Sequence, residues 1–128
     1  MINMQAPDII HLHRGNFKNT IETHPFVIVD FWAEWCVPCM DFMPTFDLVA
    51  SQHPDIQFAK VNVDTATEVV SYFNVKKIPA LLVIRDRVVI DAVEGLMKAN
   101  ELNHHIQMWR EFDMTEINAH FDAKEASS

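Results

Sequence analysis

The fold of this chain is decided by one stretch near its N-terminus, Phe26-Val27-Ile28-Val29-Asp30-Phe31-Trp32-Ala33-Glu34-Trp35-Cys36-Val37-Pro38-Cys39. Residues 26–32 are β-branched or aromatic with one acid among them, which predicts a buried strand. Residues 39–50 carry apolar side chains at helical spacing, so we expect a helix to follow. Cys36 and Cys39 therefore lie where a strand meets the N-terminus of a helix. Unpaired amide groups and the helix dipole at such a position favour a thiolate and lower the pKa of a thiol.

The two cysteines are the only ones in the chain, and their spacing allows three interpretations. They are a redox pair, half of a zinc site that needs two more ligands, or an incidental structural pair. No second C-x-x-C is present, and His104 and His105 are adjacent rather than spaced as ligands. A C-x-x-C motif beside a strand–helix pattern favours the redox pair.

Length and composition limit the possible partners. A chain of 128 residues, 49% of them hydrophobic, predicts one domain with a single core. The formal net charge of −8 argues against nucleic acid and does not favour an anionic membrane surface. The sequence shows no secretory leader and no apolar run of membrane-spanning length. We therefore expect a cytoplasmic protein, in which a C-x-x-C pair is more often catalytic than structural.

The rest of the chain alternates between strand and helix patterns. Strands are predicted over 9–13, 56–63, 80–84 and 88–93, and helices over 16–23, 68–73 and 98–112. Pro44 lies inside the helix that starts at the cysteines and is expected to bend or break it. Asp41 and Asp47, on the same helix, are expected to point outward. Residues 113–128 have a capping-box pattern followed by apolar spacing, which predicts an additional helical segment and a frayed end.

Residues 29–39 resemble the active-site segment of thioredoxins, whose usual motif is W-C-G-P-C. The resemblance extends over about residues 8–112, and further matches recur in the family's order and spacing at Pro44, Lys60, Asp64, Ile78-Pro79 and Gly95. It implies an α/β thioredoxin fold, with a central mixed β-sheet flanked by helices on both faces. We expect residues 1–112 to form this domain and residues 113–128 to be a C-terminal helical extension and tail of it.

The resemblance also implies an activity, the reduction of protein disulfides by thiol–disulfide exchange. Cys36 is the expected nucleophile and Cys39 the more buried resolving thiol. Asp30 interrupts an apolar strand, where burial raises the pKa of a carboxyl. It either points to an edge of the sheet or satisfies a backbone group, or it takes the proton of Cys39 with Lys60 as its partner, as the resemblance implies. The expected substrate-binding residues are Trp32, Trp35, Val37, Pro38, Ile78, Pro79 and Gly95.

The same resemblance implies partners. We expect disulfide-containing protein substrates, a thioredoxin reductase as electron donor, and a monomer that binds neither nucleic acid nor membranes. Apart from the Cys36–Cys39 disulfide itself, neither a metal nor an organic cofactor is expected.

Some residues depart from the family pattern. Val37 replaces the usual glycine, Met40 stands where many thioredoxins carry a basic residue, and Glu94 replaces an apolar one. The hairpin turn at residues 85–87 lacks the family's glycine, which predicts a different turn geometry. These departures and the C-terminal extension leave an alternative open, a thioredoxin-fold binding module or a redox subunit dedicated to one partner.

Overall fold

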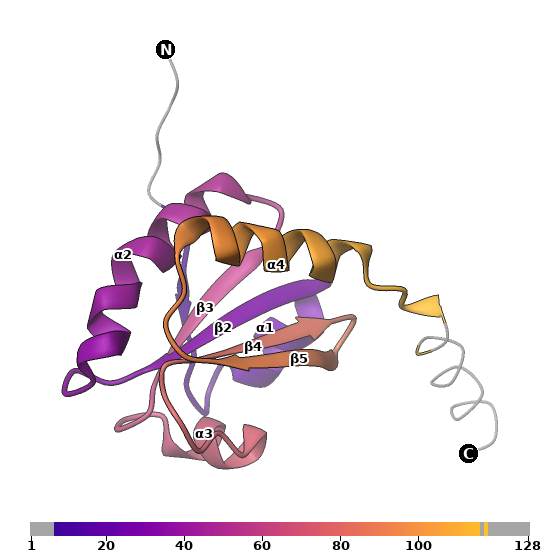
Figure 1. Ribbon diagram of the computed structural model, residues 1–128. Helices are drawn as coiled ribbons and strands as arrows, with labels where there is room; N and C mark the ends of the chain where they lie inside the picture. The colour runs from indigo at the N-terminus through magenta and orange to yellow at the C-terminus, as the bar shows by residue number, and fades with distance from the viewer. Residues whose placement is uncertain (1–6, 116, 118–128) are drawn as a thin grey trace.

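The computed structural model describes residues 7–115 and 117 (Figure 1). The chain order is β1 (Ile10–His11), α1 (Phe17–Thr23), β2 (Phe26–Trp32), α2 (Val37–Gln52), β3 (Gln57–Asn62), α3 (Thr67–Phe73), β4 (Ala80–Arg85), β5 (Val88–Glu94) and α4 (Ala99–Glu111). Most of the helical segment predicted over residues 113–128 lies outside the described residues.

The five strands form one mixed sheet in the order β1-β3-β2-β4-β5. Strands β1, β3 and β2 run parallel, whereas β4 is antiparallel to β2 and β5 is antiparallel to β4. The predicted fold class is confirmed. Strand β2 lies at the centre, and all of its residues except the last are buried. This explains why its sequence is an apolar run rather than an alternation of apolar and polar residues.

Helices cover both faces of the sheet, α2 and α4 one face and α1 and α3 the other (Figure 1). Side chains of β2 alternate between the two faces. Val27, Val29 and Phe31 pack with residues of α1 and α3, whereas Ile28 packs with residues of α2 and α4. By this alternation Asp30 faces α2, and its neighbour across the sheet on β3 is Lys60. The sheet therefore directs two charged side chains towards the helix that carries the cysteines.

Helix α2 starts earlier than predicted and is not broken at Pro44. It begins at Val37 because Cys36 is its N-cap residue, with extended backbone dihedrals and a side chain that accepts a backbone hydrogen bond. It continues without a break through Pro44, although proline cannot donate the helical hydrogen bond to the carbonyl of residue 40. Helix α2 thus connects the cysteines to the core as one element.

The β4–β5 hairpin turns through Asp86 and Arg87, and both have positive φ, at 50° and 69°. A two-residue turn with two positive φ values matches the right-handed twist of the paired strands, and Asn-Gly is its favoured sequence. A side chain in this region costs about 1 kcal/mol or more relative to glycine. The predicted hairpin forms, and without glycine two side chains take a conformation that glycine adopts more easily.

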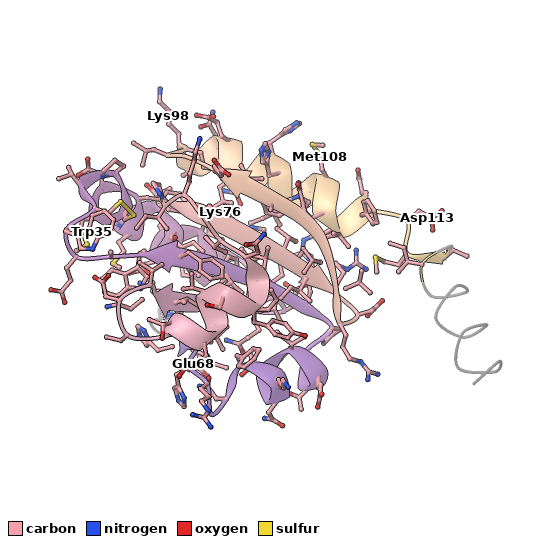
Figure 2. All side chains as sticks on the ribbon, turned by 90° about the horizontal axis from the view of Figure 1, so that it is seen from below. Trp35, Glu68, Lys76, Lys98, Met108 and Asp113 are labelled. Carbon is pink, nitrogen blue, oxygen red and sulfur yellow. A yellow bond between two sulfur atoms is a disulfide. The ribbon has the colours of Figure 1, made fainter. Side chains whose placement is uncertain are left out.

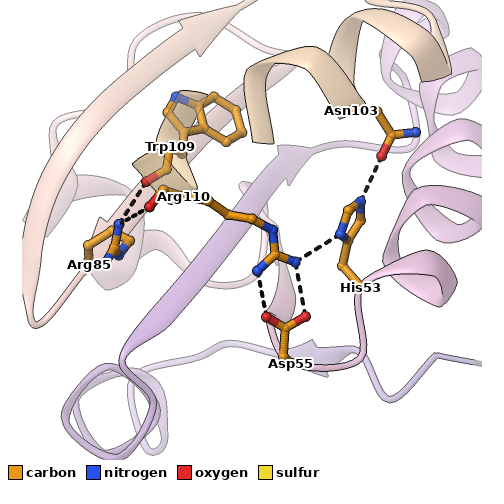
Figure 3. A network of polar contacts seen from close by, with 6 residues as sticks. All are labelled: His53, Asp55, Arg85, Asn103, Trp109 and Arg110. Atoms are coloured by element: carbon orange, nitrogen blue, oxygen red, sulfur yellow. Dashed lines mark hydrogen bonds and ion pairs between the residues drawn. The ribbon is translucent and has the colours of Figure 1, made fainter. Parts of the chain in front are cut away.

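The C-terminal half of α4 is attached to the rest of the domain by a network of polar side chains (Figure 3). Arg110 donates two hydrogen bonds to Asp55, at 2.6 and 3.0 Å, and a third to Nδ1 of His53 at 2.9 Å. Since arginine only donates, His53 accepts at Nδ1, and its Nε2 donates to Asn103 at 2.7 Å. Arg85 donates to the backbone carbonyls of residues 109 and 110 near the end of α4. These contacts hold α4 against the α2–β3 turn and β4.

Candidate active site

Cys36 and Cys39 are joined by a disulfide at the N-terminus of α2 (Figure 2). The backbone N–H of Cys39 donates to Sγ of Cys36 at 3.3 Å. Cys36 is 6% exposed and Cys39 is fully buried, which is the order of burial expected for a nucleophile and a resolving thiol. After reduction, the same N–H and the helix dipole are in place to stabilise a thiolate on Cys36.

Large apolar side chains surround the disulfide on the outer surface. Trp35 and Val37 are 67% and 69% exposed, and Met40 is also exposed. Trp35 is held in place because its Nε1 donates to Asp64 at 3.0 Å. Pro38 is exposed beside Val37, at the second position of the helix. This rim presents apolar surface next to the sulfur that a substrate disulfide must reach.

The second side of the site comes from the loop before β4 and the end of β5. Ile78 and Trp32 are partly buried and pack against the two cysteines. The Ile78–Pro79 peptide bond is cis, and the N–H of Gly95 donates to the carbonyl of Pro79 at 2.8 Å. Gly95 has φ of 99°, a conformation that side-chain-bearing residues rarely adopt. The expected substrate-binding residues thus lie in two groups around the disulfide, from the start of α2 and from the β4 and β5 ends.

A buried carboxyl faces α2, the helix that carries the cysteines. Asp30 is fully buried, and within residues 7–115 and 117 neither of its oxygens has a hydrogen-bond partner. Burial raises the pKa of Asp30 to about 7, while the positive charge of Lys60 lowers it and the negative charge of Asp47 raises it. The sheet-edge interpretation of Asp30 is therefore wrong, since the carboxyl lies in the interior. An acid with such a pKa exchanges protons near neutral pH.

Lys60 is buried, but its ammonium is paired with a residue that the sequence did not indicate. Its Nζ lies 2.8 Å from Oδ1 of Asp47 on α2, and the contact is an ion pair rather than a well-directed hydrogen bond. The expectation that Asp47 points outward holds for only part of the side chain, which is 45% exposed, because the oxygen that meets Lys60 is buried. The sequence could have indicated this contact, because Asp47 lies eight residues after Cys39, about two helical turns, and therefore near the same side of the helix.

Other features of the described chain bear on ligands and membranes. Among residues 7–115 and 117, no group of three or more His, Cys, Asp or Glu side chains is arranged to hold a metal ion. Within the same part of the chain, none of the helices has both the length and the apolar character needed to cross a membrane.

The fold and the site together define a thiol–disulfide oxidoreductase. A C-x-x-C pair at a helix N-terminus, with the first sulfur less buried than the second, has the parts that thiol–disulfide exchange requires. The comparison with known proteins identifies the family. The sequence model of the thioredoxin family matches residues 8–108.

The chain belongs to the thioredoxin family. It is 35% identical over 108 residues to putative thioredoxin 2 of Streptomyces coelicolor, covering 84% of this chain and 81% of that protein. It is 34% identical to the thioredoxin of Mycoplasmoides gallisepticum, covering 70% of this chain and 90% of that protein. The structure resembles Plasmodium falciparum thioredoxin with a TM-score of 0.74 and 27% identity, over 79% of this chain and 99% of that chain.

Proposed function

We propose that this protein reduces disulfides in other proteins, with Cys36 as the nucleophile and Cys39 as the resolving thiol. The observation that supports this order most directly is the hydrogen bond from the Cys39 N–H to Sγ of Cys36. Cys36 is the N-cap of α2 and the less buried of the two sulfurs, whereas Cys39 is enclosed. A substrate disulfide therefore meets Cys36 first.

The exchange takes place in two steps. The Cys36 thiolate attacks one substrate sulfur, the substrate disulfide breaks, and the departing substrate thiolate takes up a proton. Cys39 then loses its proton and attacks Sγ of Cys36. The mixed disulfide breaks, the Cys36–Cys39 disulfide forms, and the second substrate thiolate takes up a proton. Counting the proton that Cys36 gives up when its thiolate forms, the dithiol loses two electrons and two protons and the substrate gains the same number.

Asp30 is the group proposed to accept the proton of Cys39 in the second step. Its carboxyl is buried, and its pKa of about 7 suits proton transfer near neutral pH. Lys60 lowers the pKa of Asp30 and therefore adjusts the base strength of the carboxylate. Together these two residues supply the proton control that the resolving thiol needs.

The substrate chain is proposed to lie across the apolar rim and the loop before β4. Trp32, Trp35, Val37 and Pro38 would contact its side chains, and Ile78, Pro79 and Gly95 would lie along its backbone. Strand-like pairing with Ile78 gives affinity that depends little on the substrate sequence. This arrangement suits a reductase that acts on many extended segments.

The partners follow from the same proposal. The oxidised site must be returned to the dithiol, and a thioredoxin reductase is the proposed electron donor. The protein is proposed to work as a monomer in the cytoplasm, where disulfides are reduced rather than formed. Its redox centre is proposed to need no metal and no organic cofactor.

The test is to trap the first step with a disulfide-linked peptide as substrate. Cys39→Ser should accumulate a mixed disulfide through Cys36, detectable by intact mass, because the resolving thiol is missing. Cys36→Ser should form a mixed disulfide much more slowly than Cys39→Ser does, and it should not reduce the peptide. Rapid adduct formation by Cys36→Ser, or continued reduction by it, would overturn the assignment of the nucleophile.

A further inference from the structure

Three charged side chains meet between the sheet and α2, each from a different element. Asp30 comes from β2, Lys60 from β3 and Asp47 from α2. Asp30 and Lys60 are direct neighbours across the two parallel strands. The Lys60 ammonium could pair with either carboxylate, and in this structure its ion pair is with Asp47, at 2.8 Å.

The position of this ammonium determines the electrostatic environment of Asp30. Lys60 is buried, and its Nζ also lies 6.0 Å from the centre of the Phe46 ring, on the same helix as Asp47. Within the described part of the chain, no hydrogen bond reaches either oxygen of Asp30. Asp30 and Lys60 are both buried, whereas the Asp47 side chain is 45% exposed and meets Lys60 through one buried oxygen. Between the two buried charges a small change in distance has a large effect. A contact that draws the ammonium towards α2 therefore weakens its hold on the Asp30 carboxylate.

We propose that Asp47 is a positioning residue for the exchange reaction, because it holds the Lys60 ammonium away from Asp30 and so leaves that carboxyl able to take up the Cys39 proton. This inference rests on the role proposed for Asp30. The role proposed for Asp47 needs no contact with either cysteine, because Asp47 acts through Lys60. The carboxylate of Asp47 also disfavours a second negative charge on Asp30.

The consequence of removing Asp47 has a definite sign. In Asp47→Asn the ammonium loses its partner and is free to approach Asp30, and one negative charge near Asp30 disappears. Both changes favour the ionised carboxylate, so the pKa of Asp30 falls. A weaker base then accepts the Cys39 proton, and the pH dependence of the resolving step moves towards acid.

The direct test is a titration of the Asp30 carboxyl carbon by NMR in the oxidised protein, with the signal assigned by its loss in Asp30→Asn. Asp47→Asn should lower the titration midpoint by about one pH unit, the size expected for a nearby charge. Asp47→Glu should restore most of the original midpoint. Asp41→Asn is the matched control, since it removes an exposed carboxylate from the same helix. It should change the Asp30 titration midpoint by less than about a third of the change caused by Asp47→Asn.

A double variant separates the action through Lys60 from the charge of Asp47 itself. In a Lys60→Met background, Asp47→Asn should shift the midpoint by less than about half as much, because no ammonium remains to be positioned. An equal shift in both backgrounds would overturn the proposal, and so would an unchanged midpoint in Asp47→Asn. Thermal unfolding of each variant verifies that it is folded, and Asp47→Glu provides a second variant at the same position.

The kinetic part of the test distinguishes this proposal from the role of Asp30. Stopped-flow release of the second thionitrobenzoate from an aromatic disulfide reports the resolving step at each pH. If Asp30→Asn leaves this pH profile unchanged, the proposed proton acceptor is wrong. A second outcome is that Asp30→Asn abolishes the inflection in the plot of this rate against pH while Asp47→Asn does not move that inflection to lower pH. In that case the role of Asp30 stands and that of Asp47 is overturned.

Discussion

At the scale of single residues, the site depends on a carboxyl that the fold does not stabilise. Asp30 is fully buried and, within the residues that the structure describes, makes no hydrogen bond. Leaving a buried polar group without a partner costs about 1–3 kcal/mol, and more when it is charged. A residue that only had to support the fold would be apolar here, as its neighbours Val29 and Phe31 are.

Replacing Asp30 with Asn should therefore change how stability depends on pH. The folded pKa of about 7 exceeds the ordinary value of 3.8. The unfolded chain thus loses this proton first, and the contribution of Asp30 to folding declines as the pH rises from about 4 to about 7. Relative to the natural protein, the free energy of unfolding of Asp30→Asn should rise by about 3 kcal/mol between about pH 5 and about pH 8. Each unit of pKa shift corresponds to about 1.36 kcal/mol.

Urea unfolding of the oxidised proteins at the two pH values measures this gain. Any fixed cost of burying the Asn amide cancels in the comparison of the two pH values. Asp41→Asn is the control. Its effect on stability should be nearly the same at both pH values, because Asp41 is exposed. A pH-independent effect of Asp30→Asn would show that the carboxyl has an ordinary pKa in the folded protein.

The sequence was informative about residues whose chemistry or pattern is unusual. An acid inside an apolar strand and a C-x-x-C pair both stand out in the sequence, and in the structure the acid faces the helix that starts at the cysteines. Asp47 did not stand out, because an acid on a helix is ordinary and its contact with Lys60 joins residues from separate elements. Contacts of this kind depend on how elements pack, and one sequence does not reveal them.

At the scale of elements, strand and helix types followed from apolar periodicity, and most of their ends lie within one residue of the prediction. The first strand and α2 are the exceptions. The predicted strand over residues 9–13 is only two residues long, Ile10–His11, and α2 starts two residues before its prediction. The N-cap of α2 explains its early start, since a cysteine is not among the usual capping residues. The interruption allowed for at Pro44 did not occur, because α2 is packed along its length by Phe42, Phe46 and Val49.

The β4–β5 turn gives a prediction at this scale. Arg87→Gly should stabilise the protein by about 1 kcal/mol, because the φ of 69° at this position is unfavourable for a residue with a Cβ atom. Arg87→Ala is the matched control, since it removes the guanidinium but keeps the Cβ atom. Urea unfolding of both variants measures the difference. Equal stability of the Gly and Ala variants would contradict the strain assigned to this turn.

At the scale of the whole molecule, the sheet brings the parts of the site to one end. The disulfide follows the carboxyl end of β2, between the parallel neighbour β3 and the antiparallel neighbour β4. Loops at the carboxyl ends of strands are the usual place for a site in α/β sheets. The same end receives the loop before β4 and the end of β5, where Pro79 and Gly95 meet. Distant parts of the sequence thus surround one reactive sulfur.

The fold class and the activity are the features of the whole molecule that the sequence predicted. The alternation of strands and helices and the thioredoxin-like motifs predicted the fold class and the activity, and the structure and the family comparison confirm both. The predicted C-terminal helical segment lies mostly beyond the described residues and stays a prediction. The individual roles of the site residues also stay predictions.

The central claim is that Cys36 and Cys39 form a reversible redox pair that donates electrons to protein disulfides. The most direct test equilibrates the protein with glutathione buffers of graded ratio and follows tryptophan fluorescence. Trp32 packs against the cysteines and Trp35 lies beside Cys36, so both are placed to report the change. We predict one reversible two-electron transition that requires a large excess of reduced glutathione, and none of this kind in Cys39→Ser. The absence of a reversible transition, or full reduction by a small amount of reduced glutathione, would contradict the account of this site as a disulfide reductase.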